Sequence, residues 1–276
     1  MRLIDLSDRC LFHLSGPDAE SYLNGQVTQD VRNFNPSDPA RWACVCTAKG
    51  KMQGIVLIHR AKDGFLLDAP AELRDSLFAR LDRYLIADDA ELIDITGEKL
   101  LLHSDEKIQA DSIRSNRFGF DGYDTWLSPN EFSAQTADGP LLTEEELEAE
   151  RISAGVPRWG AELTEDTLPP EAKLEARAIS YHKGCYVGQE TISRIKSVGR
   201  VNRLLTQFTA GSSVEPGVSI YLPVQDGKPV GEITSVAEAD GQFIALGYLS
   251  RKAADATDFV TTSGSNSATI ELKVQR

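Results

Sequence analysis

The residues with the clearest chemical potential lie together in Ser180-Tyr-His-Lys-Gly-Cys-Tyr-Val-Gly-Gln-Glu190. Cys185 supplies a thiol, and Lys183 and the downstream Arg194 supply positive charge, which favours the thiolate form. The thiolate is both the nucleophilic and the metal-ligating form of cysteine. Two glycines within the segment permit tight backbone geometry. The pattern predicts a reactive or ligating cysteine in a tight loop, and the alternative is a loop cysteine without a chemical task.

The other three cysteines are Cys10, Cys44 and Cys46. Four cysteines in a chain of this length are too few for a disulfide scaffold. Cys44 and Cys46 are two residues apart in a predicted strand, so both side chains leave the same face. Because the usual zinc spacings are absent and no histidine is near in sequence, we expect these cysteines to be buried as small apolar residues and to bind no metal.

The charge of the chain is unevenly distributed. The 276 residues carry a formal charge of −13, with 41% hydrophobic and 26% charged residues, as in a soluble globular protein. An acidic protein lacks the extended basic surface that a nucleic-acid-binding protein needs, so direct nucleic-acid binding is not expected. Residues 181–203 nevertheless contain five basic residues and one acidic residue. This local excess of positive charge favours a confined anionic ligand.

The sequence contains no candidate membrane segment. No apolar run approaches the roughly 18 residues that a membrane-spanning helix needs. The first eight residues include acidic side chains where a signal peptide would have an apolar core. We therefore expect a cytoplasmic protein without a membrane partner.

Periodic patterns predict the elements that position the motif. Leucines recur every four residues between 71 and 85, which is typical of an amphipathic helix. Thr143 and Glu146 have the spacing of a capping box at the start of another helix. We expect helices at 17–24, 71–85 and 143–153, strands at 11–14, 41–47, 54–60, 64–68, 90–95 and 100–103, and strand and loop over 111–140.

Beyond residue 203 the pattern changes to short alternating strands. They are expected at 204–209, 218–222, 231–236, 242–249 and 268–274, with turns at 215–217, 225–227 and 239–241. The predicted fold is therefore α+β. It combines a composite α/β body with antiparallel sheets, residues 1–203, and a C-terminal antiparallel β-barrel, residues 204–276.

The segment Lys183-Gly-Cys-Tyr-Val-Gly-Gln-Glu190 resembles the signature Lys-Gly-Cys-Tyr-x-Gly-Gln-Glu of the YgfZ-like branch of the folate-binding T-protein superfamily. Arg194 matches the arginine that follows this signature. Stretches 25–31, 48–52 and 151–157, the last followed by 168–171, resemble other parts of the family in the same order. The resemblance covers about residues 10–203, and the predicted barrel resembles the final domain of the family.

The resemblance implies a fold and a function. The fold is that of the glycine-cleavage T-protein, a tetrahydrofolate-dependent aminomethyltransferase. YgfZ-like members are associated with folate binding, with assembly or repair of iron–sulfur clusters and, through those enzymes, with tRNA thiolation. The resemblance therefore implies a folate-binding accessory factor with reduced folate and iron–sulfur client or assembly proteins as partners. It places Cys185 and Lys183 in the functional centre, and tetrahydrofolate or a derivative beside Tyr186, Gln189, Glu190, Arg194 and Arg200.

Two departures from the T-protein bear on the chemistry. Residues 53–55, Gln-Gly-Ile, stand where the T-protein has its catalytic aspartate, and Ser153 stands where it has a folate-binding glutamate. A site without both carboxylates cannot perform the same acid–base and electrostatic chemistry. We therefore expect an accessory protein more than an enzyme. A folate-dependent one-carbon transferase and a direct tRNA-binding module are the two alternatives.

The aromatic and imidazole side chains outside the motif give weaker signals. His13, His59 and His103 fall in predicted strands, where packing is expected. Of the three tryptophans, Trp42, Trp126 and Trp159, we expect at least two to pack in the core, although each has a ring that can stack on a pterin.

Overall fold

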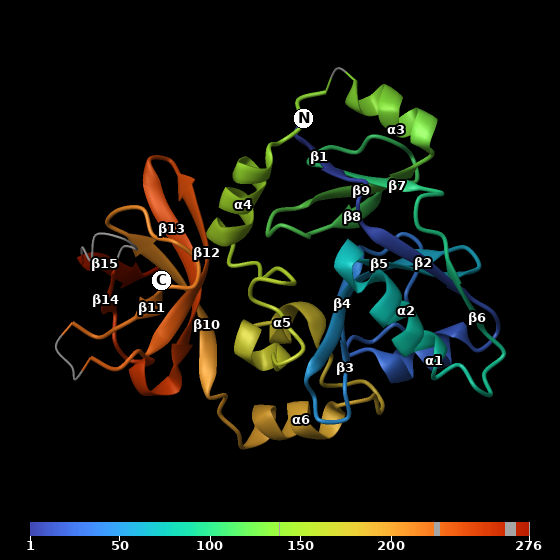
Figure 1. Ribbon diagram of the computed structural model, residues 1–276. Helices are drawn as coiled ribbons and strands as arrows, with labels where there is room; N and C mark the ends of the chain where they lie inside the picture. The colour runs from blue at the N-terminus through green and yellow to red at the C-terminus, as the bar shows by residue number, and fades with distance from the viewer. Residues whose placement is uncertain (138, 224–226, 263–268, 276) are drawn as a thin grey trace. The chain divides into compact units, whose positions relative to one another are not determined.

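The structure is a computed structural model that describes residues 1–137, 139–223, 227–262 and 269–275 (Figure 1). The chain forms two compact units. The first unit comprises Met1–Leu142 and Leu174–Ser193, and the second comprises Thr143–Lys173 and Arg194–Arg276. The domain boundary expected after residue 203 stays a prediction.

The first unit contains two antiparallel sheets, ordered β3-β4-β5-β2-β6 and β1-β7-β9-β8. Its strands are β1 Leu3–Leu6, β2 Cys10–Ser15, β3 Arg41–Cys46, β4 Met52–Ala61, β5 Gly64–Ala69, β6 Glu91–Asp94, β7 Leu100–Ser104, β8 Ile113–Ser115 and β9 Gly122–Leu127. Its helices are α1 Ala19–Gln26, α2 Arg74–Asp82, α3 Pro129–Thr136 and α5 Glu175–Ala178, with a 3₁₀ turn at Ala71–Leu73. Helix α6, Gln189–Ser197, begins in this unit.

The leucine repeat forms the helix that covers the five-stranded sheet. Leu73, Leu77 and Leu81 are all buried. A Cβ atom on Gly54 of β4 would lie 3.1 Å from the Leu77 side chain, so the helix approaches the strand closely at this glycine. The α-helix ends at Asp82, so the prediction that it continues to residue 85 is wrong at its C-terminal end.

A buried ionic network joins the two sheets of the first unit. Asp68 of β5 and Asp124 of β9 are fully buried, and Arg117 lies between them. The Arg117 guanidinium contacts Asp68 at 2.7 Å and Asp124 at 2.5 Å. Arg9 forms a second ion pair with Asp68. Each buried carboxylate is therefore compensated by arginine, as a charge in this environment requires.

Two buried histidines pack against the same network. His103 Nδ1 lies 2.8 Å from Asp124 Oδ1. The His59 ring is fully buried and meets the Trp126 ring edge to face, with centroids 5.8 Å apart. The expectation that these two histidines pack in the protein interior is confirmed.

The second unit is built on a six-stranded antiparallel sheet, ordered β11-β12-β13-β10-β15-β14. Its strands are β10 Arg203–Ala210, β11 Ser219–Ile220, β12 Gly231–Ala239, β13 Gln242–Ser250, β14 Asp258–Thr262 and β15 Thr269–Val274. Tyr221 and Val260 exchange backbone hydrogen bonds of 2.8 and 2.9 Å, which joins the β11 edge to β14 and nearly closes the sheet. The predicted C-terminal barrel is confirmed, with β14 as an additional strand. Residues 225 and 226 of one predicted turn and residue 268 of a predicted strand lie outside the described residues.

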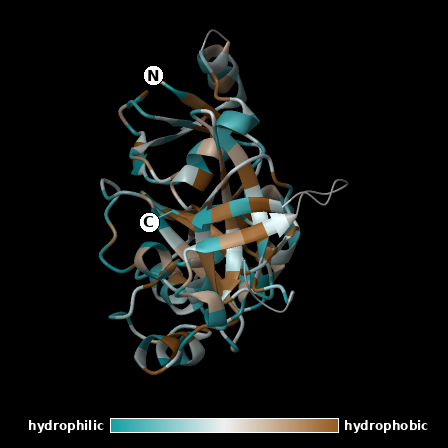
Figure 2. Ribbon diagram, turned by 90° about the vertical axis from the view of Figure 1, so that its left-hand side faces the viewer, coloured by the Kyte–Doolittle hydropathy of each residue, from teal (hydrophilic) through white to brown (hydrophobic). Residues whose placement is uncertain are grey.

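Helix α4, Glu144–Ser153, packs on the outside of this sheet. Phe208 and Phe259 meet edge to face inside the barrel, whereas Ile152 packs with Leu246 and Tyr248 on the other face. Strand β13 is therefore buried on both faces. In Figure 2 the strands turned towards the viewer carry both hydrophobic and hydrophilic segments, as alternating strands do.

Candidate functional site

The cysteine motif links α5 to α6 in the first unit. Residues 179–188 form a loop, and α6 begins at Gln189, within the motif itself. Gly188 has φ +91°, a conformation that favours glycine, directly before this helix. The sequence predicted the tight loop and missed the helix that follows it.

Lys183 anchors the loop from inside the protein. Its ammonium group donates to the carbonyl oxygens of Asn24 at 2.6 Å, Val27 at 2.7 Å and Gln29 at 2.7 Å. The residue is only 6% exposed. Burial lowers the pKa of Lys183 to about 7, and Asp30 acts in the opposite direction. Three acceptors require three N–H donors, which only the protonated amine has. Lys183 therefore holds the loop in position, and its predicted effect on the Cys185 thiolate stays a prediction.

Backbone hydrogen bonds attach both ends of the loop to the same segment of the chain. Ser180 N donates to Thr28 O at 3.0 Å, and the Thr28 hydroxyl donates to Ala178 O at 2.6 Å. Val187 N donates to Gly25 O at 3.1 Å. Stretch 25–31, one of the other stretches that resemble the family, thus holds both ends of the cysteine loop.

The β3–β4 hairpin also packs against the cysteine motif. A Cβ atom on Gly188 would lie 2.7 Å from Thr47 O, and one on Gly50 would lie 3.0 Å from the Thr191 side chain. Both glycines also have positive φ. Glycine at 188 and at 50 therefore permits the hairpin to meet the start of α6, so stretch 48–52 contacts the motif as well.

Cys185 differs from the other three cysteines in its environment. It is exposed, whereas Cys10, Cys44 and Cys46 are buried. Burial raises the pKa of the Cys10 and Cys44 thiols to about 12 and that of Cys46 well above its usual value. The expected burial of Cys44 and Cys46 is confirmed. Of the four thiols, the one at position 185 is therefore the one that an external partner can reach.

The residues expected to hold a cofactor are not all alike in exposure. Tyr186 is 7% exposed, and its ring lies 5.1 Å from the Lys183 ammonium. Gln189 is half-buried, whereas Glu190, Arg194 and Arg200 are exposed. Arg194 and Arg200 belong to the second compact unit. Tyr186 is therefore largely buried. The exposed side chains of Glu190, Arg194 and Arg200 are the ones that a ligand can reach.

Gln53 and Ser153, the two residues that differ from the T-protein, each accept a hydrogen bond from a nearby side chain. Gln53 Oε1 accepts from Arg80 Nε at 2.8 Å, in a pocket of about 390 Å³. The carbonyl oxygen of Ser153 accepts from Gln207 Nε2 at 2.9 Å. Neither position offers a carboxylate, so these residues do not fit the reactive chemistry of an aminomethyl-bearing folate. Arg194 and Arg200 are exposed, and their predicted contact with the anionic tail of a folate stays a prediction.

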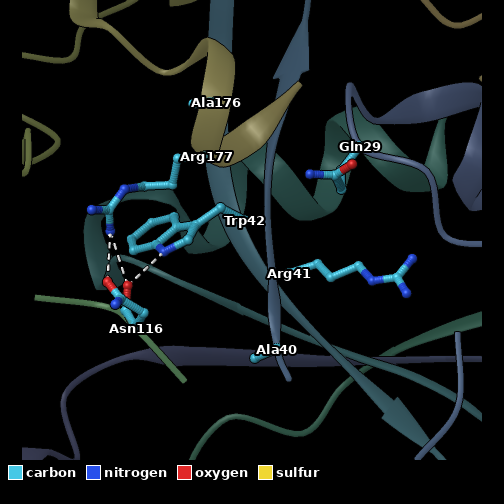
Figure 3. Close-up of a pocket in the computed structure, with 7 residues that line it drawn as sticks. All are labelled: Gln29, Ala40, Arg41, Trp42, Asn116, Ala176 and Arg177. Atoms are coloured by element: carbon cyan, nitrogen blue, oxygen red, sulfur yellow. Dashed lines mark hydrogen bonds between the residues drawn. The ribbon is translucent and has the colours of Figure 1, made fainter. Parts of the chain in front are cut away.

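A second pocket in the first unit, of about 420 Å³, was not predicted from the sequence (Figure 3). It includes Trp42, Asn116 and Arg177. The only sequence signal was the aromatic ring of Trp42. Among the residues the structure describes, no cluster of three or more histidine, cysteine or acidic side chains could hold a metal ion. In the same described ranges, no helix is long and apolar enough to cross a membrane.

Comparison with known proteins gives consistent results. No family model matches the chain. The chain is 28% identical to "tRNA-modifying protein YgfZ" of Cronobacter sakazakii, over 99% of this chain and 92% of that protein. It is 29% identical to the protein of the same name from Photobacterium profundum, over 94% of this chain and 86% of the other.

Among solved structures, the chain resembles the glycine cleavage system aminomethyltransferase T of Bartonella henselae. The TM-score is 0.86 at 19% identity, over 100% of this chain and 85% of the other. The T-protein fold is therefore confirmed, and the resemblance to YgfZ-like proteins extends over nearly the whole chain.

Proposed function

We propose that this YgfZ-like chain is a folate-binding accessory factor that supports iron–sulfur enzymes and thereby tRNA modification, with Cys185 as its functional thiol. The observation that carries the proposal is the exposure of Cys185 on a loop fixed by Lys183 and Gly188. The names of the YgfZ relatives support the link to tRNA modification. A thiolate is a ligand for iron and a nucleophile for sulfur chemistry, which suits either assembly or repair of a cluster.

The chain alone supplies one exposed thiol. A four-iron cluster is usually held by four cysteine ligands. We therefore propose that Cys185 acts as a transient ligand or thiol towards a cluster held mainly by a client or assembly protein. This role makes the surrounding loop a contact surface for that partner.

Folate binding is the second part of the proposal. A reduced folate carries carboxylates, and the exposed Arg194 and Arg200 are suited to bind them. The resemblance to folate-binding proteins supports the same ligand. Because neither Gln53 nor Ser153 is acidic, we propose that the folate is bound without aminomethyl transfer.

The proposal is tested in a strain that lacks the chromosomal copy. The loss should lower the activity of a four-iron-cluster enzyme and the level of thiolated tRNA, and a plasmid copy should restore both. Normal levels of both in the deletion strain would exclude the proposed role. Calorimetry with tetrahydrofolate and 5-formyl-tetrahydrofolate tests the ligand, and turnover of a methylene-folate donor would favour a transferase instead.

A further inference from the structure

The pocket around Trp42 is a candidate site that the proposed function does not use. Trp42 lies near the start of β3, Arg177 lies on α5, and Asn116 follows β8. Three separate segments of the first unit therefore contribute to one hollow of about 420 Å³. This volume falls within the usual range for small-ligand pockets, roughly 300–1,000 Å³.

Asn116 fixes the positions of the two largest side chains in the pocket. Trp42 Nε1 donates to Asn116 O at 3.2 Å. Arg177 Nη1 donates to the same oxygen at 2.9 Å and to Asn116 Oδ1 at 3.4 Å, as Figure 3 shows. The Arg177 guanidinium lies 6.0 Å from the centre of the Trp42 ring. An aromatic face and a cation are thus held at a fixed spacing before any ligand arrives, which reduces the entropy cost of binding.

The charge of Arg177 is not neutralised within the described residues. Its hydrogen-bond acceptors are the two neutral oxygens of Asn116, and its Nε and Nη2 groups donate to no acceptor in that part of the chain. Burial lowers the pKa of Arg177, which means that the site disfavours an uncompensated positive charge. An anionic ligand would compensate this charge.

Arg41, at the other side of the pocket, is already engaged. It donates to Asp30 O at 2.7 Å and to the Asp38 carboxylate at 3.3 Å, and in Figure 3 it extends away from the Trp42 ring. Gln29 also lines the pocket, and its Oε1 accepts from Asp30 N at 3.0 Å. Its amide Nε2 has no acceptor in the described ranges and can donate to a carbonyl oxygen of a ligand.

We propose that this pocket binds a nucleotide, with the base stacked on Trp42 and the phosphate on Nε and Nη2 of Arg177. The spacing of 6.0 Å between the Arg177 guanidinium and the Trp42 ring favours a nucleotide over a folate. In a nucleoside monophosphate only a ribose separates the base from the phosphate. In a folate, an aminobenzoyl group and an amide link separate the pteridine from the carboxylates. Bases stack readily on aromatic side chains, and arginine binds phosphate through paired N–H groups.

The same chemistry is offered by a free mononucleotide and by one nucleotide of a single-stranded RNA. The test therefore measures affinities of the full chain for GMP, guanosine, inorganic phosphate, 5-formyl-tetrahydrofolate and a short single-stranded RNA. GMP should bind at least about tenfold more tightly than guanosine or phosphate. A free nucleotide is the source if the RNA binds no better than GMP, and RNA is the source if it binds at least about tenfold better.

Substitutions connect the binding to the pocket. Trp42→Ala should weaken GMP binding by roughly 5- to 150-fold, the range expected for one stacked base. Arg177→Gln should weaken GMP binding, leave guanosine binding unchanged and flatten the dependence on salt. Tyr84→Ala and Arg83→Gln are matched controls, because these residues line the 390 Å³ pocket of the same unit. Both should bind GMP as the unchanged protein does.

Three results would overturn the assignment. They are the absence of GMP binding at millimolar concentration, equal GMP affinity in Trp42→Ala, and a 5-formyl-tetrahydrofolate affinity that exceeds that of GMP and falls in the same variants. Cys185→Ser should leave GMP binding unchanged. Failure of this inference is thereby separated from failure of the proposed thiol function.

Discussion

The Lys183 ammonium lies 2.7 Å from the carbonyl oxygen of Val27, and this contact ties the cysteine loop to the end of α1. The same ammonium donates to two further carbonyl oxygens in that segment. The lysine of the motif therefore holds the backbone that presents Cys185. The conformation of the loop therefore depends on a buried amine and its three carbonyl acceptors.

Replacement of this lysine should destabilise the protein. Lys183→Met leaves three carbonyl oxygens without their donor, and each buried unsatisfied group costs about 1–3 kcal/mol. We expect the free energy of unfolding, measured in urea, to fall by about 3 kcal/mol or more. Lys49→Met, at an exposed position of the adjacent hairpin, should change it by less than about 0.5 kcal/mol. Equal effects of the two substitutions would contradict the anchoring role.

The two glycines of the motif should respond differently to alanine. At Gly188 the backbone has φ +91°, and a Cβ atom would lie 2.7 Å from Thr47 O. A Cβ atom on Gly184 would have no atom within 4 Å apart from its chain neighbours. Gly188→Ala should therefore lower the free energy of unfolding by about 2 kcal/mol or more, and Gly184→Ala by less than about 1 kcal/mol. Thermal unfolding followed by circular dichroism distinguishes the pair. A larger loss for Gly184→Ala would contradict the packing of α6 against the hairpin.

The sequence predicted the local loop better than the distant contacts that hold it. The motif predicted the tight loop around Cys185, because the glycines that permit it are visible in one short segment. It did not show that Lys183 is buried, since its three acceptors lie more than 150 residues away along the chain. The resemblance of stretch 25–31 to the family was the one signal that this distant segment belongs to the site.

The secondary-structure predictions likewise depended on local sequence signals. The capping box at Thr143 correctly located α4, and the same signal at Ser128 and Glu131, with Pro129 between them, would have located α3. The buried pair Asp68 and Arg117 could not be predicted, because tertiary contact alone distinguishes it from surface charge.

The buried ionic network should make stability depend on pH. Burial alone would raise the pKa of Asp124, but Arg117 and hydrogen bonds from His103 and Arg117 together hold it below its usual value. Burial lowers the pKa of His59. Both groups bind protons more weakly in the folded state, so their stabilisation is present at neutral pH and is lost on acidification. The free energy of unfolding should fall below about pH 6.5 through His59 and more steeply below about pH 4 through Asp124.

Urea unfolding from pH 3 to 8 measures this dependence. Asp124→Asn should lower the free energy of unfolding at pH 7 by about 3 kcal/mol, since it leaves Arg117 buried with one carboxylate fewer. It should also reduce the slope below pH 4. A rise in stability on acidification would show that the sign of the linkage is wrong.

Thiol labelling should separate Cys185 from the buried cysteines. Iodoacetamide at pH 8 should modify one thiol in the native protein and four in urea, because Cys10, Cys44 and Cys46 are buried and their pKa values are raised. Mass spectrometry should locate the native label at Cys185, and Cys185→Ser should abolish it. Rapid native labelling of Cys44 would contradict the burial of that residue.

The most direct test of the central claim is complementation of a deletion strain by cysteine variants, scored by four-iron-cluster enzyme activity and tRNA thiolation. Cys185→Ser keeps size and polarity but loses the soft thiolate, so we expect a folded protein that restores neither readout. Cys10→Ser is the matched control, because Cys10 is buried and its Sγ lies 3.4 Å from two carbonyl oxygens to which a hydroxyl can also donate. We expect this control to restore both readouts. Full complementation by Cys185→Ser, at protein levels equal to the control, would contradict the claim that Cys185 is the functional thiol.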